Sequence, residues 1–147
     1  MHIPDLLATL LAFWPRSTVR TPSHQRIPDY RSPELVKRAL TNLDSPDALE
    51  RNPLVQLPVI SSRRSAAELR ALLVDVVAEL SDSRIPRDAE AGRLLLDYYV
   101  KRVGTHEVTM ARLNMSRPTY YRRLREGYVL VAQQLSRLSE FAVRFPD

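Results

Sequence analysis

Residues 105–125 read THEVTMARLNMSRPTYYRRLR, and this stretch carries the strongest structural signals in the chain. Thr105 is suited to cap a short helix over 106–113, because its hydroxyl can accept a backbone N–H bond at the helix start. Asn114 follows, and asparagine tolerates the left-handed backbone that a sharp turn requires. Ser116 then caps a second helix, whose first turn holds a proline where a missing amide hydrogen costs little. The pattern predicts two helices joined by a tight turn.

The second of these helices has an apolar side and a polar, basic side. At about 100° per residue, the apolar side holds Tyr120, Leu124, Gly127, Val131 and Leu135. We expect this side to pack on helices predicted at 65–80 and 88–103. Thr119, Arg122 and Arg125 fall roughly opposite. Two helices joined by a tight turn, the second rich in arginine, predict a helix-turn-helix.

This stretch resembles the helix-turn-helix of bacterial transcription regulators and of sigma factor region four. The pattern L-x-M/V-S-R-x-T-x-x-R-x-L of that broad family is matched by Leu113, Met115, Ser116, Arg117, Thr119, Arg122 and Leu124. The resemblance covers 105–125 strictly and extends loosely over 65–137. Asn114 stands where the family usually has a turn glycine, and Thr109 and Met110 replace a common Val-Ala pair. The resemblance implies an all-helical protein that binds double-stranded DNA.

Such a helix enters the major groove end-on, so its first turns are expected to contact the bases. The residues expected to face the bases are Ser116, Arg117, Thr119, Tyr121, Arg122 and Arg125. Arginine can form two hydrogen bonds to guanine O6 and N7, and a threonine methyl can contact the thymine methyl. Phosphate contacts, which fix the position without reading sequence, are expected from Lys101, Arg102, Arg112 and Arg123. The alternative for each basic residue is a solvated surface charge.

The charge distribution favours an anionic partner for this segment. The chain has 22 basic and 17 acidic residues, a net charge of +5. Residues 101–137 hold eight basic and two acidic residues, a net of +6, so the remaining fourteen basic and fifteen acidic residues give −1. Because basic side chains release counterions when they meet phosphates, DNA binding should weaken steeply with salt.

No pattern of catalytic or metal-binding residues is present in the sequence. There is no cysteine, so neither a disulfide, a thiolate zinc site nor a cysteine nucleophile is expected. The histidines His2, His24 and His106 lack metal-ligand spacing. GxGxxG, GxxxxGK[ST] and GxSxG are all missing. We therefore expect no enzyme activity, no cofactor and no metal.

The N-terminal part of the chain is predicted to be less regular. Residues 1–31 comprise a short apolar helix at 5–14, which packs on this chain's own core or on a partner, and a linker in which prolines alternate with arginines. Residues 32–64 are predicted to form a helical, partly irregular connecting region. In it, Ser32 and a following proline begin a helix that ends by Asp44, and a short helical piece reaches Arg51. The stretch 53–58 is predicted to wrap or form one turn.

Residues 65–147 are predicted to form the DNA-binding domain. Ser65 and a glutamate three residues later form a capping box for the helix at 65–80. Asp88 is a candidate cap for the next helix, which we expect to end at Gly104. The arginine-rich helix keeps its apolar period to Phe141, which is more than a reading helix needs. The excess predicts packing on the N-terminal segments or pairing with a second copy.

These features predict an all-α, tri- or tetrahelical helix-turn-helix bundle with an N-terminal helical extension and a proline-rich linker. The expected function is sequence-specific binding of double-stranded DNA by a bacterial or phage transcription regulator, located in the cytoplasm on the nucleoid. Two alternatives remain: a module that docks on RNA polymerase or a larger regulatory protein, and a phage packaging or recombination accessory subunit. A homodimer is also left open. No membrane partner is expected, because the longest apolar run, residues 6–14, is well short of the roughly twenty residues that span a bilayer. The first five residues also lack the positive charge expected at the start of a secretory signal.

Overall fold

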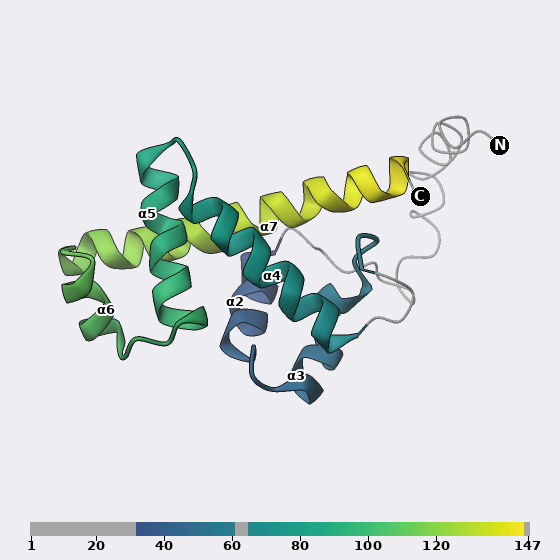
Figure 1. Ribbon diagram of the computed structural model, residues 1–147, viewed down its shortest axis with the longest axis horizontal. Helices are drawn as coiled ribbons and strands as arrows, with labels where there is room; N and C mark the ends of the chain where they lie inside the picture. Colours follow the sequence, from purple (N-terminus) through teal and green to yellow (C-terminus); the bar gives the residue numbers. More distant parts are fainter. Residues whose placement is uncertain (1–31, 61–64, 146–147) are drawn as a thin grey trace.

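The computed structural model describes residues 32–60 and 65–145, and within these ranges the regular elements are all helical (Figure 1). The predicted all-α class is therefore confirmed for the described residues. The predicted apolar helix at 5–14 and nearly all of the linker lie outside them. The elements are α2 (Pro33–Thr41), α3 (Pro46–Arg51), a 3-10 helix η1 (Pro53–Gln56), α4 (Ala66–Ser81), α5 (Pro86–Leu95), a π-helical turn η2 (Leu96–Val100), α6 (His106–Arg112) and α7 (Arg117–Arg144).

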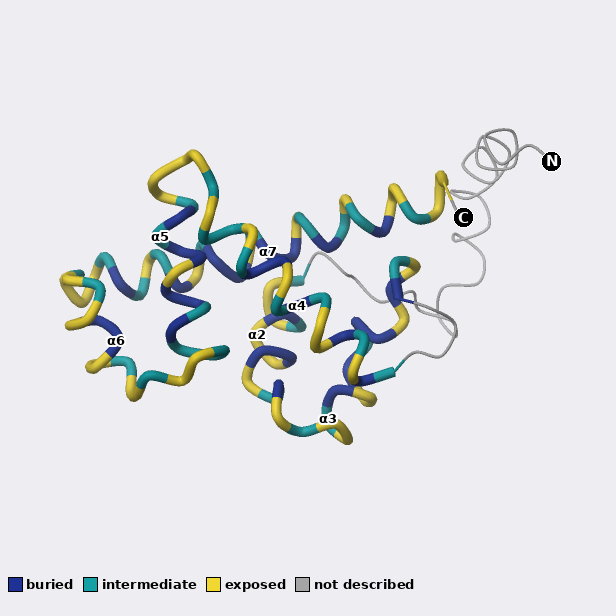
Figure 2. The backbone as a smooth tube through the Cα atoms, viewed as in Figure 1, coloured by how far each residue is buried: buried dark blue, intermediate teal, exposed yellow. Residues whose placement is uncertain are grey.

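The long helix α7 is the element around which the others pack. It contacts α5, α2 and α4, and the buried stretches of these helices meet around its middle (Figure 2). The predicted apolar side of α7 is confirmed, since all five of its residues are buried: Tyr120, Leu124, Gly127, Val131 and Leu135. The C-terminal turns of α7 extend away from the remaining helices in Figure 1. One core therefore holds the first two thirds of this helix.

Residues 32–60 contribute to this core. Val36 and Leu40 of α2 and Leu54 of η1 are essentially inaccessible to solvent and belong to the same apolar cluster as the buried residues of α4 and α7. Asn52 fastens the segment, because its side chain accepts a hydrogen bond from the Leu54 amide (2.8 Å) and donates one to the carbonyl of Leu35 (3.2 Å). The predicted short helical piece and the following turn are both present, as α3 and η1.

Helices α4 and α5 pack against each other and approach closely where α4 ends. At the start of α4, Ser65 Oγ accepts a hydrogen bond from the amide of Glu68 (3.2 Å), as the capping pattern predicts. On α5, a Cβ atom added to Gly92 would lie 2.3 Å from the backbone nitrogen of Ser81. Glycine is therefore required there, because the two backbones leave no room for a side chain.

The predicted start of α5 is wrong. The N-cap residue is Ile85, and Asp88 lies inside the first turn. Pro86 occupies the first helical position, where its fixed φ suits the helix and its missing amide hydrogen costs nothing. The helix therefore begins before Asp88, whose negative charge is favourable near the N-terminal end of the helix dipole.

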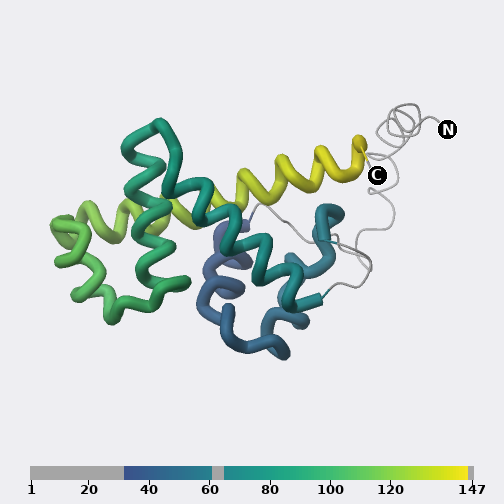
Figure 3. The backbone as a smooth tube through the Cα atoms, in the orientation of Figure 1, coloured from purple at the N-terminus to yellow at the C-terminus, as the bar shows by residue number. Residues whose placement is uncertain are grey.

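The predicted end of this helix, at Gly104, is also wrong. The α-helix ends at Leu95 and widens into the π turn η2, where the amide of Lys101 donates to the carbonyl of Leu96 (2.8 Å). Arg102 then adopts a left-handed conformation with φ 55°, which ends the helix before Gly104 is reached. After this loop the chain turns back, so that α6 lies beside the start of α7 (Figure 3).

Candidate nucleic-acid interface

The connection between α6 and α7 has the local structure that its sequence predicts. Thr105 Oγ1 accepts a hydrogen bond from the amide of Val108 (3.2 Å) and begins α6. Asn114 has φ 56°, the left-handed conformation expected at the sharp turn. Ser116 Oγ accepts from the amide of Thr119 (3.4 Å) and begins α7. The side chains at both helix starts and the asparagine between them therefore set the path of the turn.

Aromatic and polar side chains hold α6 against α7. His106 Nδ1 lies 2.7 Å from the hydroxyl of Tyr120, which is fully buried. The imidazole also stacks on Tyr98 of η2, with 3.9 Å between ring centroids, and meets Tyr121 edge-on. Burial lowers the pKa of His106 and raises that of Tyr120, whose hydroxyl also contacts buried Thr109. Both groups are therefore uncharged at neutral pH, and a neutral imidazole nitrogen can accept a hydrogen bond from the tyrosine hydroxyl.

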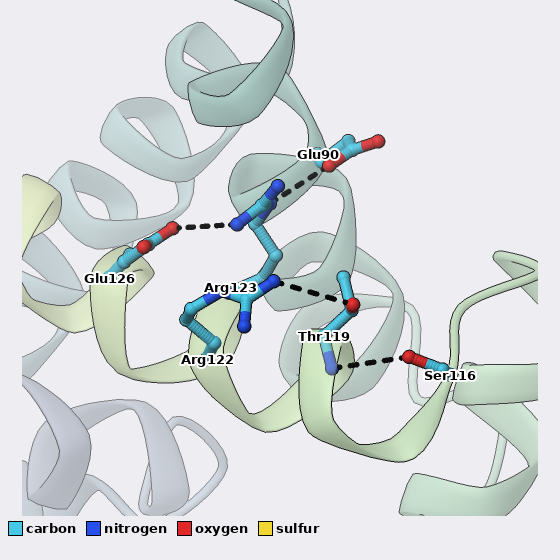
Figure 4. Close-up of polar contacts among 6 residues, drawn as sticks. All are labelled: Glu90, Ser116, Thr119, Arg122, Arg123 and Glu126. Atoms are coloured by element: carbon cyan, nitrogen blue, oxygen red, sulfur yellow. Dashed lines mark hydrogen bonds and ion pairs between the residues drawn. The ribbon is translucent and has the colours of Figure 1, made fainter.

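The six residues predicted to face bases all lie at the start of α7, at positions 116–125. Ser116, Arg117, Arg122 and Arg125 are exposed, whereas Thr119 and Tyr121 are half-buried. Arg117 lies 3.7 Å from a carboxylate oxygen of Glu107 on α6, and the two side chains are 61% and 63% exposed. Arg122 donates to the Thr119 hydroxyl (3.4 Å), as Figure 4 shows. The exposed cations are thus restrained only by weak contacts with neighbouring side chains.

Arg123 does not fit its predicted role as a phosphate contact. Its side chain is only 14% exposed, Nε donates to Glu90 of α5 (2.9 Å), and Nη1 donates to Glu126 (3.2 Å) (Figure 4). The hydrogen bond to Glu90 raises the pKa of Arg123 further above its ordinary value. We correct the prediction: the positive charge of Arg123 is balanced by two carboxylates of the protein itself, and the side chain joins α7 to α5.

The other three predicted phosphate contacts are exposed, and two of them have carboxylate partners. Arg102 pairs with Asp44 in the turn after α2, and Arg112 Nε donates to the buried carboxylate of Asp97 on η2 (3.2 Å). The Arg112 side chain is still 57% exposed, so its remaining donors face solvent. Lys101 is exposed next to Arg102. Lys101 and Arg102 come directly after η2, and Arg112 is the last residue of α6, so none of the three lies at the start of α7.

One basic residue beside the start of α7 was not predicted. A cleft of 440 Å³ separates the first turn of α5 from α7, and Arg87 lines it together with Arg122 and Arg125. Asp88 and Glu126 lie in the same cleft, which leaves one net positive charge among these five residues. Arg87 was not recognised as a site residue, because the predicted cap at Asp88 placed it before the start of α5. The proline before it was the signal that could have placed it in the first turn.

The described residues contain no group of three or more histidine, aspartate or glutamate side chains placed to hold a metal ion. None of the helices in the described part is long and apolar enough to cross a bilayer. Comparisons of the chain with protein-family models, curated proteins and solved structures found no match.

Proposed function

We propose that the chain binds duplex DNA through a helix-turn-helix made of α6, the turn at Asn114 and the start of α7, and that it regulates transcription. The observation that carries the proposal is the division of α7 into two sides. Arg117, Arg122 and Arg125 are exposed, while Tyr120 and Leu124 between them are buried against the core. A firmly packed helix that presents several guanidinium groups in its first turns has the form needed to enter a major groove.

Individual side chains suit different parts of such a complex. Arg117 and Arg122 can hydrogen-bond to guanine, and the Thr119 methyl can contact thymine. The contact with Glu107 does not prevent this, because exposed ion pairs contribute little and are readily exchanged. Arg87 extends the positive charge beside the start of α7, and we assign it to a phosphate. Phosphate binding fixes the position of the protein, and Arg117 and Arg122 read the bases.

The proposal is tested by selecting binding sites from random duplexes and measuring affinity for the selected site by fluorescence anisotropy at two salt concentrations. Arg117→Ala with Arg122→Ala should weaken binding at least about 30-fold, since each base-contacting arginine contributes about 1–3 kcal/mol. Arg87→Ala should weaken selected and unrelated duplexes alike and reduce the salt slope by about one.

Arg51→Ala is the matched control, because Arg51 is an exposed arginine of α3, a helix that lies apart from α6 in Figure 1. Its affinity should equal that of the unaltered protein. Circular dichroism must first show that each variant is folded. If the double variant binds the selected duplex as tightly as the control, the assigned DNA surface is wrong.

A second candidate function is docking on another protein or on a second copy of this chain. The observation that favours it is an apolar surface near the end of α7, where Phe141 and Phe145 are 62% and 59% exposed, their ring centroids lie 4.8 Å apart, and Val143 is also exposed. Sedimentation of Phe141→Ser with Phe145→Ser against the unaltered chain tests self-association. A sedimentation coefficient that falls in the variant supports pairing through this end of α7, and an unchanged one excludes it.

A further inference from the structure

A second cleft, of 470 Å³, lies between α2 and the segment that leads from η2 into α6. Its polar and aromatic walls come from three parts of the chain: Lys37 and Thr41 of α2, Tyr98 and Tyr99 of η2, and Arg102 and His106 of the following segment. The volume is within the range of small-molecule sites. Apart from Arg102, none of these residues belongs to the predicted DNA contacts.

The cleft has an excess of positive charge. Lys37 is exposed, and its ammonium group pairs with no carboxylate among residues 32–60 and 65–145. Arg102 is 65% exposed and pairs with Asp44, which is 57% exposed. Two cations therefore line the cleft, whereas Asp44, which also lies 4.0 Å from Arg70, is outside the lining. An anion entering the cleft meets one cation without a partner and a second one whose ion pair is open to water.

The backbone around Arg102 is held in an unusual conformation. Arg102 has φ 55°, a region that side-chain-bearing residues rarely adopt, and Gly104 follows with φ 154°. The ion pair with Asp44 joins this segment to the turn that follows α2, the helix that forms the opposite wall of the cleft. Strained residues of this kind concentrate at ligand clamps. Here the strained residue is itself a cation that lines a cleft.

The interior of the cleft offers aromatic and hydroxyl groups. The hydroxyl of Tyr99 is hydrogen-bonded to those of Tyr128 and Thr41, and Thr41 also donates to the carbonyl of Lys37 (2.8 Å). Tyr98 stacks on His106, which fixes both rings. These contacts connect α7, η2 and α2, so the interior is preorganised. It provides a planar, partly apolar surface beside the two cations.

We propose that this cleft binds a small organic anion. Its phosphate or carboxylate group pairs with Lys37 and Arg102, and its planar or apolar part lies against Tyr98 and Tyr99. Because the walls belong to α2 and to the segment that leads into α6, a bound anion links these two parts of the protein. The site is separate from the DNA surface at the start of α7 and does not require that surface to be correct.

The experiment is a titration of the full-length, 15N-labelled chain with phenyl phosphate, benzoate, inorganic phosphate and benzyl alcohol, followed through amide chemical shifts. We expect saturable shifts at Thr41 and Gly104 with phenyl phosphate or benzoate, and the tighter of the two identifies the anionic group. Inorganic phosphate should bind more weakly because it lacks the apolar part, and benzyl alcohol because it lacks the charge.

Two variants test the assigned cations. Lys37→Ala and Arg102→Gly should each raise the Kd at least about threefold, since each removes an exposed charge contact. Glycine is used at position 102 because it accepts a positive φ. Arg38→Ala is the matched control, because it removes an exposed positive charge from the neighbouring position of α2, outside the cleft lining.

Two outcomes overturn the proposal. One is the absence of saturable shifts with every anionic probe. If Lys37→Ala weakens duplex affinity in that case, the cleft takes a DNA phosphate instead. The other is binding that Lys37→Ala and Arg102→Gly leave as tight as Arg38→Ala does. The probe titration contains no DNA, so this proposal and the DNA-binding proposal can fail independently.

Discussion

His106 is the residue at which α6, η2 and α7 meet. Its ring stacks on Tyr98, accepts or donates a hydrogen bond with Tyr120, and meets Tyr121 edge-on. Burial is the main cause of its lowered pKa, and the nearby carboxylate of Glu107 acts in the opposite direction without reversing it. The folded protein therefore favours the neutral ring more strongly than the unfolded chain does.

This preference predicts a loss of stability on mild acidification. The unfolded chain takes up a proton on histidine near pH 6.5, whereas His106 in the folded protein takes it up at lower pH. Since the unfolded state then binds more protons, stability is complete above pH 6.5 and falls as the pH decreases toward the folded pKa. The measurement is the urea midpoint at several pH values between 7.5 and 5.5.

The control for this prediction is His106→Gln, which retains polar groups but does not titrate. Its urea midpoint should change less between pH 7.5 and 5.5 than that of the unaltered chain. Equal pH dependence in both proteins would assign the effect to other groups, including the two histidines outside the described residues.

Arg123 shows why individual side chains in the candidate site could not all be assigned from sequence. Helical phase correctly separated the buried side of α7 from its exposed side. It could not show that Arg123 meets Glu90, a residue 33 positions earlier in the chain. Within residues 32–60 and 65–145, Arg117, Arg122 and Arg125 have no such distant partner, and they were placed correctly on the exposed surface. Phase identifies the side of a helix, whereas the partner of a charge depends on tertiary packing.

At the scale of elements, the contact between α4 and α5 depends on Gly92. Gly92→Ala should destabilise the protein by about 3 kcal/mol, because the added methyl would overlap the backbone of Ser81. A backbone cannot move aside by changing a rotamer, as a side chain can. The change is measured as a loss in the free energy of unfolding in urea.

Gly127→Ala is the comparison for this prediction. Its added Cβ would lie 3.0 Å from a methyl carbon of Leu95, a side chain that can adjust. The cost of this contact is offset by the helix preference of alanine, about 1 kcal/mol, so we expect little net change in stability. If the two variants were equally stable, the close approach of α4 and α5 would not be what requires Gly92.

The helix boundaries separate signals that are local in sequence from those that are not. The caps at Ser65, Thr105 and Ser116 were predictable because each serine or threonine binds an amide three residues ahead. The end of α5 was not, because a π turn and a left-handed arginine have no strong sequence signature. Asp88 was a poor guide because the neighbouring proline satisfied the helix start without a side-chain cap.

At the scale of the whole molecule, α2 and α7 share one core although they are far apart in sequence. The apolar length of the arginine-rich helix predicted packing on the N-terminal segments or on a second copy, and the contact between α2 and α7 confirms the first alternative for α2. Periodicity could not choose between them, because it does not reveal which helices pack together. Val36, Ala39 and Leu40 of α2 are all buried. A connecting region would not bury its apolar residues so completely.

A chain that begins at residue 65 should therefore be much less stable than the full chain. Without α2, α3 and η1, apolar surface on α4 and α7 becomes exposed, and burial contributes about 25 cal/mol per Å². We expect a lower urea midpoint, a broader transition and binding of a hydrophobic dye. The control is a chain that begins at residue 32, which retains these elements. If both shortened chains unfold at the same midpoint, α2 is dispensable to the core.

The length of α7 has a mechanical consequence. It is one uninterrupted helix of 28 residues, and Gly127 lies against Leu95 of α5 partway along it. From Gly127, the helix extends about 15 Å back to Arg117 and about 25 Å on to Arg144. The core buries α7 from Tyr120 to Leu135, on both sides of this contact, so the helix does not turn about Gly127 alone. A force applied at Phe141 therefore reaches the arginines at the other end only through a stretch that is packed on α2, α4 and α5.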